Sequence, residues 1–247
     1  MSPMTDHLEL RQRISDAALA LAENSATSFS GHCNLSNRVS DDTFLLTNIE
    51  GHARTATPQD IALVDSSGNI LDGDMEPGNI EIIQMHAAVY RKYPEYGGVV
   101  HTHSPYLLAF AMANTPLECR YEGMLRWGQA TNVPVVPWAP RGSEHSVEGI
   151  MRTLEAHPHT KAVLLGNHGV LVFGGDVTEA AQLLIILEEA AQGELNSLPI
   201  GGAKDFPPGA LEEVRESMRR AREHHDHGHS HDHDHDHSHG HSHGDDA

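Results

Sequence analysis

Short apolar segments of strand length alternate irregularly with longer amphipathic segments along this chain of 247 residues, and this pattern constrains the fold more than any other feature. Residues 60–65 (DIALVD) and the later ILDGD flank the turn sequence SSGN, which predicts a β-hairpin. A hairpin among irregularly interleaved helices favours a mixed or antiparallel sheet flanked by helices over a doubly wound parallel sheet. The expected fold class is therefore α/β.

Hydrophobic periodicity predicts the remaining elements. We expect helices over about residues 6–24, 80–92, 107–113, 146–156 and 177–195. We expect strands over residues 43–47, 97–103, 132–138, 162–165 and 170–173, and an ordered loop over residues 25–37. The pattern contains no domain boundary before about residue 200. We therefore expect one domain over residues 1–200, a linker and short charged helix over 201–223, and a tail over 224–247.

Histidine is the most unusually abundant residue, with 21 copies, of which 11 lie after Arg222. There they alternate with Asp, Ser and Gly, and no aliphatic residue appears before Ala247. Such a segment has nothing to bury and is expected to be disordered. Alternating His and Asp also bind divalent metal ions loosely, so the tail is either a metal reservoir or a segment without physiological role.

Charge and cysteine content exclude several classes of protein. The net charge of -19 argues against nucleic acid or an anionic membrane as a partner. Two distant cysteines, Cys33 and Cys119, provide neither a disulfide framework nor a cysteine-type zinc site. The longest aliphatic run, Leu183 to Leu187, is far too short to span a bilayer, and charged residues near the N-terminus are untypical of a secretory leader. A cytoplasmic location is the expectation.

The most informative local motif is His101-Thr102-His103 on a predicted strand. Side chains at positions i and i+2 of a strand face the same side, so both imidazoles can approach one cation. His168, where a predicted strand meets a glycine turn, is a candidate third ligand, although such a histidine is also typical of a hydrogen-bonded turn. Three histidines with an open coordination position are typical of a catalytic metal site, in which the metal acts as a Lewis acid on a carbonyl oxygen.

These motifs resemble the class II aldolase/adducin family. The segment from Met85 to Tyr106 resembles the family signature, in which a helix ending in Tyr and Pro precedes a strand with a His-x-His pair. Other matches follow in the family's order: Asn34 to Arg38, Thr57-Pro58, Gly68 with Gly73, Asn167 to Gly169, and the Glu-rich helix around Glu188-Glu189. The resemblance covers about residues 8–198 and excludes the tail.

The resemblance implies a three-layer α/β/α fold with a central, mostly antiparallel sheet. It also implies a homotetramer with active sites at the subunit interfaces. It implies a divalent metal ion held by His101, His103 and His168, with zinc first and manganese, cobalt, nickel or iron as alternatives. In the family's aldolases, the metal stabilises the enediolate that is left when a carbon–carbon bond of a small ketose breaks.

The sequence departs from the aldolases at the acid/base glutamate. The aldolases carry a glutamate four residues before the histidine that matches His86. This chain has Ile82 at that position, and Glu81 lies one position earlier. Neighbouring helical positions differ by about 100° in direction, so Glu81 can serve as the catalytic base only if the helix entry is shifted. Otherwise Glu81 is a first-turn carboxylate of a helix capped by Asn79, and Glu122 is a weaker substitute as base.

The phosphate-binding segments depart as well. Sugar-phosphate members have a Thr-Ser-Gly-Asn loop and a Ser-Ser pair, whereas here the loop reads Gly-His-Cys-Asn and the pair falls on Ile80 and Glu81. A non-phosphorylated hydroxy-carbonyl compound is therefore the expected substrate. The candidate substrate-binding residues are Asn34, Ser36 and His32, with His32 and His86 also compatible with structural roles. Tyr121 is a candidate proton donor to the site of a neighbouring subunit.

Three hypotheses remain from the sequence. The first is a metal-dependent lyase that cleaves a carbon–carbon bond by a retro-aldol reaction. The second is a decarboxylase or epimerase that uses the same metal site, since both need a stabilised enolate. The third is a non-catalytic, adducin-like protein, against which the intact histidine triad argues.

Overall fold

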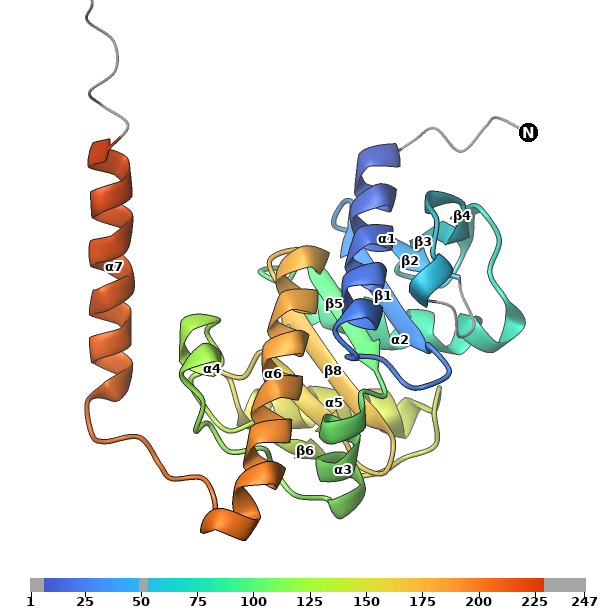
Figure 1. The fold of residues 1–247 in the computed structure, drawn as a ribbon. Helices are drawn as coiled ribbons and strands as arrows, with labels where there is room; N and C mark the ends of the chain where they lie inside the picture. Colours follow the sequence, from blue (N-terminus) through green and yellow to red (C-terminus); the bar gives the residue numbers. More distant parts are fainter. Residues whose placement is uncertain (1–6, 49–52, 229–247) are drawn as a thin grey trace, which may run out of the picture. The chain divides into compact units, whose positions relative to one another are not determined.

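The computed structural model describes residues 7–48 and 53–228, and these divide into two units. The first unit, residues 1–206, contains the central sheet and the helices that cover it (Figure 1). The second unit begins at Pro207 and contains helix α7 (Ala210–Gly228). Most of the predicted tail therefore lies outside the described residues. No helix in the described part of the chain is both long and apolar enough to span a membrane.

The first unit is built on an eight-stranded sheet with the strand order β4-β3-β2-β1-β5-β8-β7-β6. All neighbouring strands are antiparallel except β6 and β7, which are parallel. The strands are β1 (Cys33–Arg38), β2 (Thr43–Thr47), β3 (Ile61–Asp65), β4 (Ile70–Asp72), β5 (Gly98–Thr102), β6 (Val135–Val136), β7 (Ala162–Leu165) and β8 (Gly169–Gly174). The predicted hairpin is β3 and β4, joined through the SSGN turn.

Helices cover both faces of the sheet, and each layer has its own hydrophobic core. One layer consists of α1 (Leu8–Glu23), α3 (Pro105–Ala113) and α6 (Val177–Ser197), packed on residues such as Leu35, Val100 and Val172. The other consists of α2 (Pro77–Lys92) and α5 (Glu144–Ala156), packed on Leu46, Val99 and Phe173. The short helix α4 (Glu122–Arg126) lies against α6, and the 3₁₀ turns η1 (Ala53–Thr55), η2 (Pro58–Asp60) and η3 (Leu198–Ile200) complete the elements. The three-layer α/β/α prediction with a mostly antiparallel sheet is confirmed.

The loop predicted over residues 25–37 is wrong in its second half, which forms β1 at the centre of the sheet. Asn, Ser and Asn in CNLSNR suggested a loop, yet the segment alternates as a strand does. Cys33 and Leu35 enter the apolar core on the α1 side, while Asn34 and Ser36 face the other side. Pairing with both β2 and β5 satisfies the backbone, so a strand with polar side chains is stable here.

Helix α2 begins at Pro77, three residues earlier than predicted, and proline suits a first helical position because its missing N–H has no partner there. Asn79 is therefore not a cap. It lies inside the helix and is fully buried. The earlier start also moves Glu81 beyond the first turn, where the interaction with the helix dipole is weaker.

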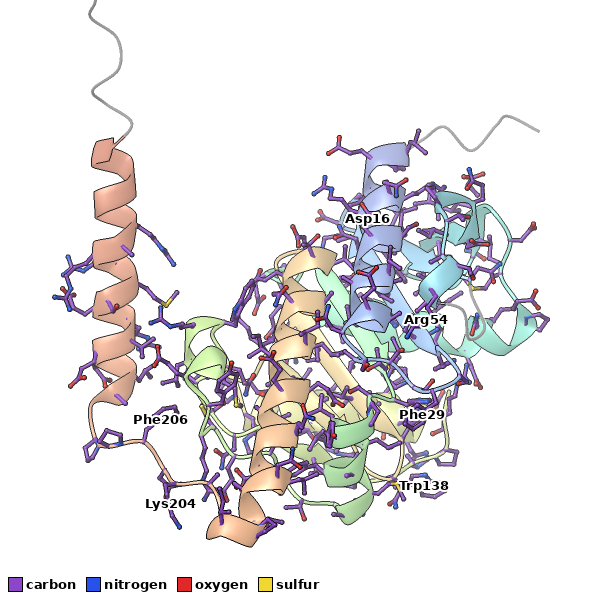
Figure 2. The ribbon with its side chains drawn as sticks, in the orientation of Figure 1. Asp16, Phe29, Arg54, Trp138, Lys204 and Phe206 are labelled. Carbon is purple, nitrogen blue, oxygen red and sulfur yellow. The ribbon has the colours of Figure 1, made fainter. Side chains whose placement is uncertain are left out.

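Several large side chains project from the loops of the first unit (Figure 2). Phe29, in the loop before β1, is fully exposed in the single chain, and Trp138, after β6, is 62% exposed.

Candidate metal centre

Strand β5 and its continuation place two imidazoles at one end of the sheet. His101 is buried, and its side chain shares a face of the sheet with that of its partner Asn34 on β1. His101 Nδ1 lies 2.9 Å from the carbonyl oxygen of Val170 on β8, to which a protonated Nδ1 donates. That hydrogen bond fixes the ring and leaves Nε2 as the free ligand nitrogen, the usual arrangement of metal-binding histidines.

His168 joins this pair from the turn between β7 and β8. Its backbone N–H donates to the carbonyl of Leu165 at 2.9 Å, and Asn167 before it adopts a left-handed conformation with φ 56°. The ring centroid of His168 lies 4.8 Å from that of His101 and 4.9 Å from that of His103. The His101 and His103 centroids are also 4.9 Å apart. The three rings therefore form a nearly equilateral cluster.

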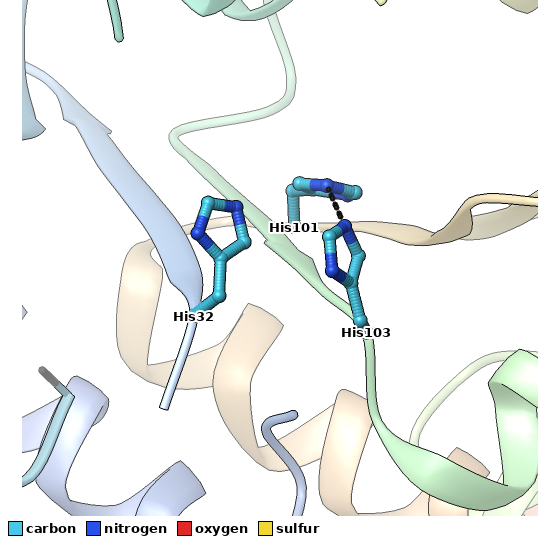
Figure 3. Close-up of side chains that lie close together, drawn as sticks. All are labelled: His32, His101 and His103. Carbon is cyan, nitrogen blue, oxygen red and sulfur yellow. Dashed lines mark hydrogen bonds between the residues drawn. The ribbon is translucent and has the colours of Figure 1, made fainter. Parts of the chain in front are cut away.

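A fourth imidazole belongs to the same cluster. The His32 ring stacks on His103, with centroids 4.8 Å apart and an angle of 23° between the planes, and it meets His101 edge-on at 6.2 Å (Figure 3). In the described part of the chain, His32, His101 and His103 are the residues whose ligand nitrogens all lie within 4.8 Å of one another. The sequence motif alone does not reveal this closeness.

The spacing of the nitrogens and the protonation of the rings both fit a divalent metal ion. His101 Nε2 and His103 Nε2 are 3.2 Å apart. Two nitrogen ligands of a tetrahedral zinc ion are about 3.3 Å apart, given zinc–nitrogen bonds of about 2.0–2.1 Å.

Burial, aided by the neighbouring imidazoles, lowers the pKa of His103 to about 4 and holds that of His101 well below its ordinary value. Burial also lowers the pKa of His168. Neutral rings are the form that binds metals.

Gly169 allows the close approach of β8 to the histidines. A Cβ at this position would lie 2.5 Å from the carbonyl oxygen of Thr102 and 2.7 Å from Cδ2 of His103. Both distances are shorter than real Cβ contacts, so any side chain here must displace the His103 ring or the strand. The glycine after His168 is therefore required by packing, because only a residue without a Cβ fits between Thr102 and the His103 ring.

We expect Gly169→Ala to lower metal affinity at least tenfold, because even outer-shell disturbances of metal ligands cost about 10–100-fold. Gly193→Ala is the matched control, since a Cβ there meets nothing within 4 Å. Gly193 lies in α6, where alanine is favoured over glycine by about 1 kcal/mol, so the control should be at least as stable as the parent. Metal titration with a competing chelator measures both, and equal affinities would contradict this account of Gly169.

Glu81 forms an ion pair with Arg141 and is not among the residues whose ligand atoms cluster with those of His101 and His103 in the described part of the chain. Its Oε1 lies 2.7 Å from Nε of Arg141, and its side chain is 42% exposed. Ile82, at the position of the aldolase glutamate, is buried in the apolar core between α2 and the sheet. The positive charge of Arg141 nevertheless reaches the cluster, since it contributes to lowering the pKa of His168 and His103. Glu81 and Arg141 thus form a charged pair beside the cluster.

The two polar residues of β1 have different environments. Asn34 is fully buried, and neither its Nδ2 nor its Oδ1 has a hydrogen-bond partner among the described residues. Ser36 Oγ lies 2.6 Å from His86 Nδ1 and 2.8 Å from the hydroxyl of Tyr90, both on α2. Burial lowers the pKa of His86 to about 3, so this ring stays neutral. The amide of Asn34 can therefore form hydrogen bonds with a bound molecule, whereas the hydroxyl of Ser36 connects the sheet to α2.

Tyr121 lies at the beginning of α4, and its hydroxyl donates to Glu189 of α6 at 3.2 Å. Together with Glu118, Arg120 and Glu194 it lines a surface pocket of about 370 Å³ that none of the four imidazoles lines. Within one chain, Tyr121 thus belongs to a different surface, and its role as a proton donor stays a prediction about a neighbouring subunit.

Sequence reasoning missed the contribution of Glu188. Its carboxylate, buried under α3, accepts hydrogen bonds from the backbone N–H groups of Tyr106 (2.7 Å) and Leu107 (2.9 Å). These N–H groups lie in the first turn of α3, three and four residues beyond His103, so Glu188 fixes the backbone that follows a candidate ligand. Burial raises the pKa of Glu188. The signal in the sequence is a glutamate within the apolar run LLIILEEAA.

Comparison with known proteins is consistent with this geometry. The chain belongs to the class II aldolase and adducin N-terminal domain family, whose model matches residues 12–195. It is 33% identical over 171 residues to a 3-oxo-tetronate 4-phosphate decarboxylase of Haemophilus influenzae, covering 66% of this chain and 76% of that protein. It is 31% identical over 139 residues to an L-fuculose phosphate aldolase of Methanococcus maripaludis, covering 55% and 69%.

A solved L-fuculose 1-phosphate aldolase superposes with a TM-score of 0.73, covering 85% of this chain and 96% of that one at 21% identity. That likeness supports the fold. Membership of the family, together with its aldolase and decarboxylase relatives, indicates a metal-dependent enzyme of the aldolase type.

Proposed function

We propose that this protein is a lyase that cleaves a carbon–carbon bond of a small hydroxy-carbonyl compound at a divalent metal ion held by His101, His103 and His168. The observation that carries the proposal is the nearly equilateral arrangement of the three neutral rings. Nitrogen ligands suit zinc, with cobalt, nickel, iron and manganese as alternatives. The metal would supply electrostatic stabilisation of the negative charge that develops on the substrate oxygen as the bond breaks.

The protein's own residues account for binding and proton transfer. In a retro-aldol reaction a base removes the proton of the substrate hydroxyl, the bond electrons move toward the carbonyl group, and an acid later protonates the carbon. Glu81 is the candidate base, provided that substrate binding releases it from Arg141. The buried amide of Asn34, beside His101, is placed to bind a hydroxyl or carbonyl group of the substrate. Tyr121 of a neighbouring subunit is the candidate acid.

Decarboxylation is the second candidate function. The Glu81–Arg141 ion pair favours it, because a carboxylate held in an ion pair is a poorer base for a retro-aldol reaction. Loss of CO₂ from a 3-oxo acid leaves an enolate directly, so no base has to remove a hydroxyl proton. Arg141, whose charge reaches the cluster, can bind an anionic group of such a substrate. The Haemophilus influenzae relative is named as a decarboxylase. Epimerisation would use the same stabilised enolate, whereas a non-catalytic, adducin-like role leaves the histidine cluster unexplained.

The substrate is expected to lack a phosphate group. Ile80 and Glu81 stand where sugar-phosphate members have hydroxyl groups, and the carboxylate of Glu81 would repel a phosphate dianion. We expect the zinc-loaded protein to release an aldehyde or CO₂ from non-phosphorylated hydroxy-carbonyl compounds or 3-oxo acids at least tenfold faster, as kcat/KM, than from their phosphate esters. Coupled assays on matched pairs of substrates measure both products, and a preference for fuculose 1-phosphate would overturn this choice of substrate.

The assembly and the tail complete the proposal. We expect a cytoplasmic homotetramer, and the exposed Phe29 and Trp138 are consistent with apolar contacts between subunits (Figure 2). Analytical ultracentrifugation tests the assembly. We also expect the histidine-rich tail to bind additional divalent metal weakly, so a chain that ends at Arg222 should retain about one tightly bound ion per subunit.

A further inference from the structure

We propose that His32 is a fourth metal ligand, which makes this centre an all-imidazole site. The inference rests on the proposed function for the presence of the metal and deepens it by assigning a ligand. Nothing in the His-x-His motif requires a contribution from residue 32, which lies just before the first strand.

The backbone holds His32 in place. Its N–H donates to Ser28 Oγ at 2.9 Å, and the preceding Gly31 donates to the carbonyl of Ser28 at 2.8 Å. The carbonyl of Gly31 accepts from the N–H of Ala53 at 3.2 Å, and Cys33 begins the central strand β1. These contacts fix the backbone of the residue and the stacked His103 ring restricts its side chain, so binding a metal orders few further torsions.

The ring of His32 lies against two of the proposed ligands. It stacks on His103 at 4.8 Å and meets His101 at 6.2 Å (Figure 3). Its ligand nitrogen lies within 4.8 Å of theirs, and the described residues that satisfy this closeness include no carboxylate. Only modest rotations of side chains would bring the nitrogens into one coordination sphere, since a tetrahedral zinc site needs separations of about 3.3 Å.

The residues at and next to the position of the aldolase glutamate do not compete with His32 for the metal. Glu81 is paired with Arg141, and Ile82, at the position that matches the aldolase glutamate, is apolar and 3% exposed. Among the described residues, the donor atoms that lie within 4.8 Å of one another here are therefore nitrogens alone. Four neutral ligands leave the full double charge of the cation for the substrate, and they favour zinc, cobalt, nickel or copper over manganese and magnesium.

X-ray absorption spectroscopy of the zinc-loaded chain ending at Arg222 tests this assignment, because it counts imidazole ligands without reference to activity. This chain lacks the tail histidines and retains the whole first unit, with both hydrophobic cores. We expect the number of imidazoles to fall by one in His32→Ala, and zinc affinity to fall at least tenfold. Glu81→Gln should leave both quantities unchanged within a factor of two.

Control variants separate the loss of a metal ligand from misfolding and from the loss of an unrelated histidine. His159→Ala, on an exposed turn, is the histidine control and should change neither quantity. Circular dichroism and chain assembly show whether His32→Ala folds, and His32→Gln provides a polar replacement if it does not. An unchanged imidazole count in the His32 variants, or a loss of zinc affinity in Glu81→Gln, would overturn the inference. Absence of zinc from the parent chain would instead overturn the proposed function.

Discussion

Replacing His101 by alanine is expected to abolish tight metal binding and, with it, turnover. His101 is the most buried of the three nearly equally spaced rings, and its Nδ1 is fixed by the carbonyl oxygen of Val170. Loss of outer-shell partners alone lowers metal affinity about 10–100-fold, so loss of a direct ligand should exceed 100-fold. We expect kcat/KM to fall by at least the same factor at limiting zinc.

The measurement uses the chain that ends at Arg222, so that the tail histidines do not contribute metal. Zinc content after dialysis, followed by a competitive titration, gives the stoichiometry and the affinity. His159→Ala should match the parent in both, since this ring is exposed and lies on the turn before β7. A folded His101→Ala protein that still retains one tightly bound zinc per subunit would contradict the assignment of this ligand.

The sequence predicts the fold well because its periodic segments are long and most of them bury one face. Helices α1, α2, α5 and α6 and strands β2, β3, β7 and β8 agree with the predicted segments within a few residues. Strand β1 was missed because four of its six side chains are polar. Asn34, Ser36 and Asn37 are nevertheless buried, and Asn34 and Ser36 share the face of the sheet that carries His101. A polar strand at the centre of a sheet has no signature in one sequence, since part of its stability comes from β5, which lies far away in the chain.

Prediction from the sequence meets a similar limit at the candidate site. The spacing of His101 and His103 predicts that they share a face, because that follows from strand geometry alone. The approach of His32, the burial of Ile82 and the pairing of Glu81 with Arg141 depend on where loops and helix starts lie in space. Helix α2 buries Ile82, Ile83 and His86, whereas Glu81 is 42% exposed and paired with Arg141.

The unsatisfied amide of Asn34 leads to a prediction in which stability and activity change in opposite directions. We expect Asn34→Leu, which has nearly the same shape, to raise the free energy of unfolding of the substrate-free protein by about 1–3 kcal/mol. The reason is that Nδ2 and Oδ1 are fully buried without partners among the described residues, and leucine removes both. The same change should raise KM at least about tenfold, since a hydrogen bond to the substrate is lost.

Ser36→Ala is the matched control, two residues along the same strand and on the same face. It removes the hydroxyl that pairs with His86 Nδ1 and Tyr90, so it should lower the free energy of unfolding by about 1 kcal/mol or more. Denaturant unfolding and steady-state kinetics measure the two variants side by side. A destabilised Asn34→Leu protein with an unchanged KM would mean that Asn34 serves the fold, because a buried amide that stabilises the free protein must already have its partners.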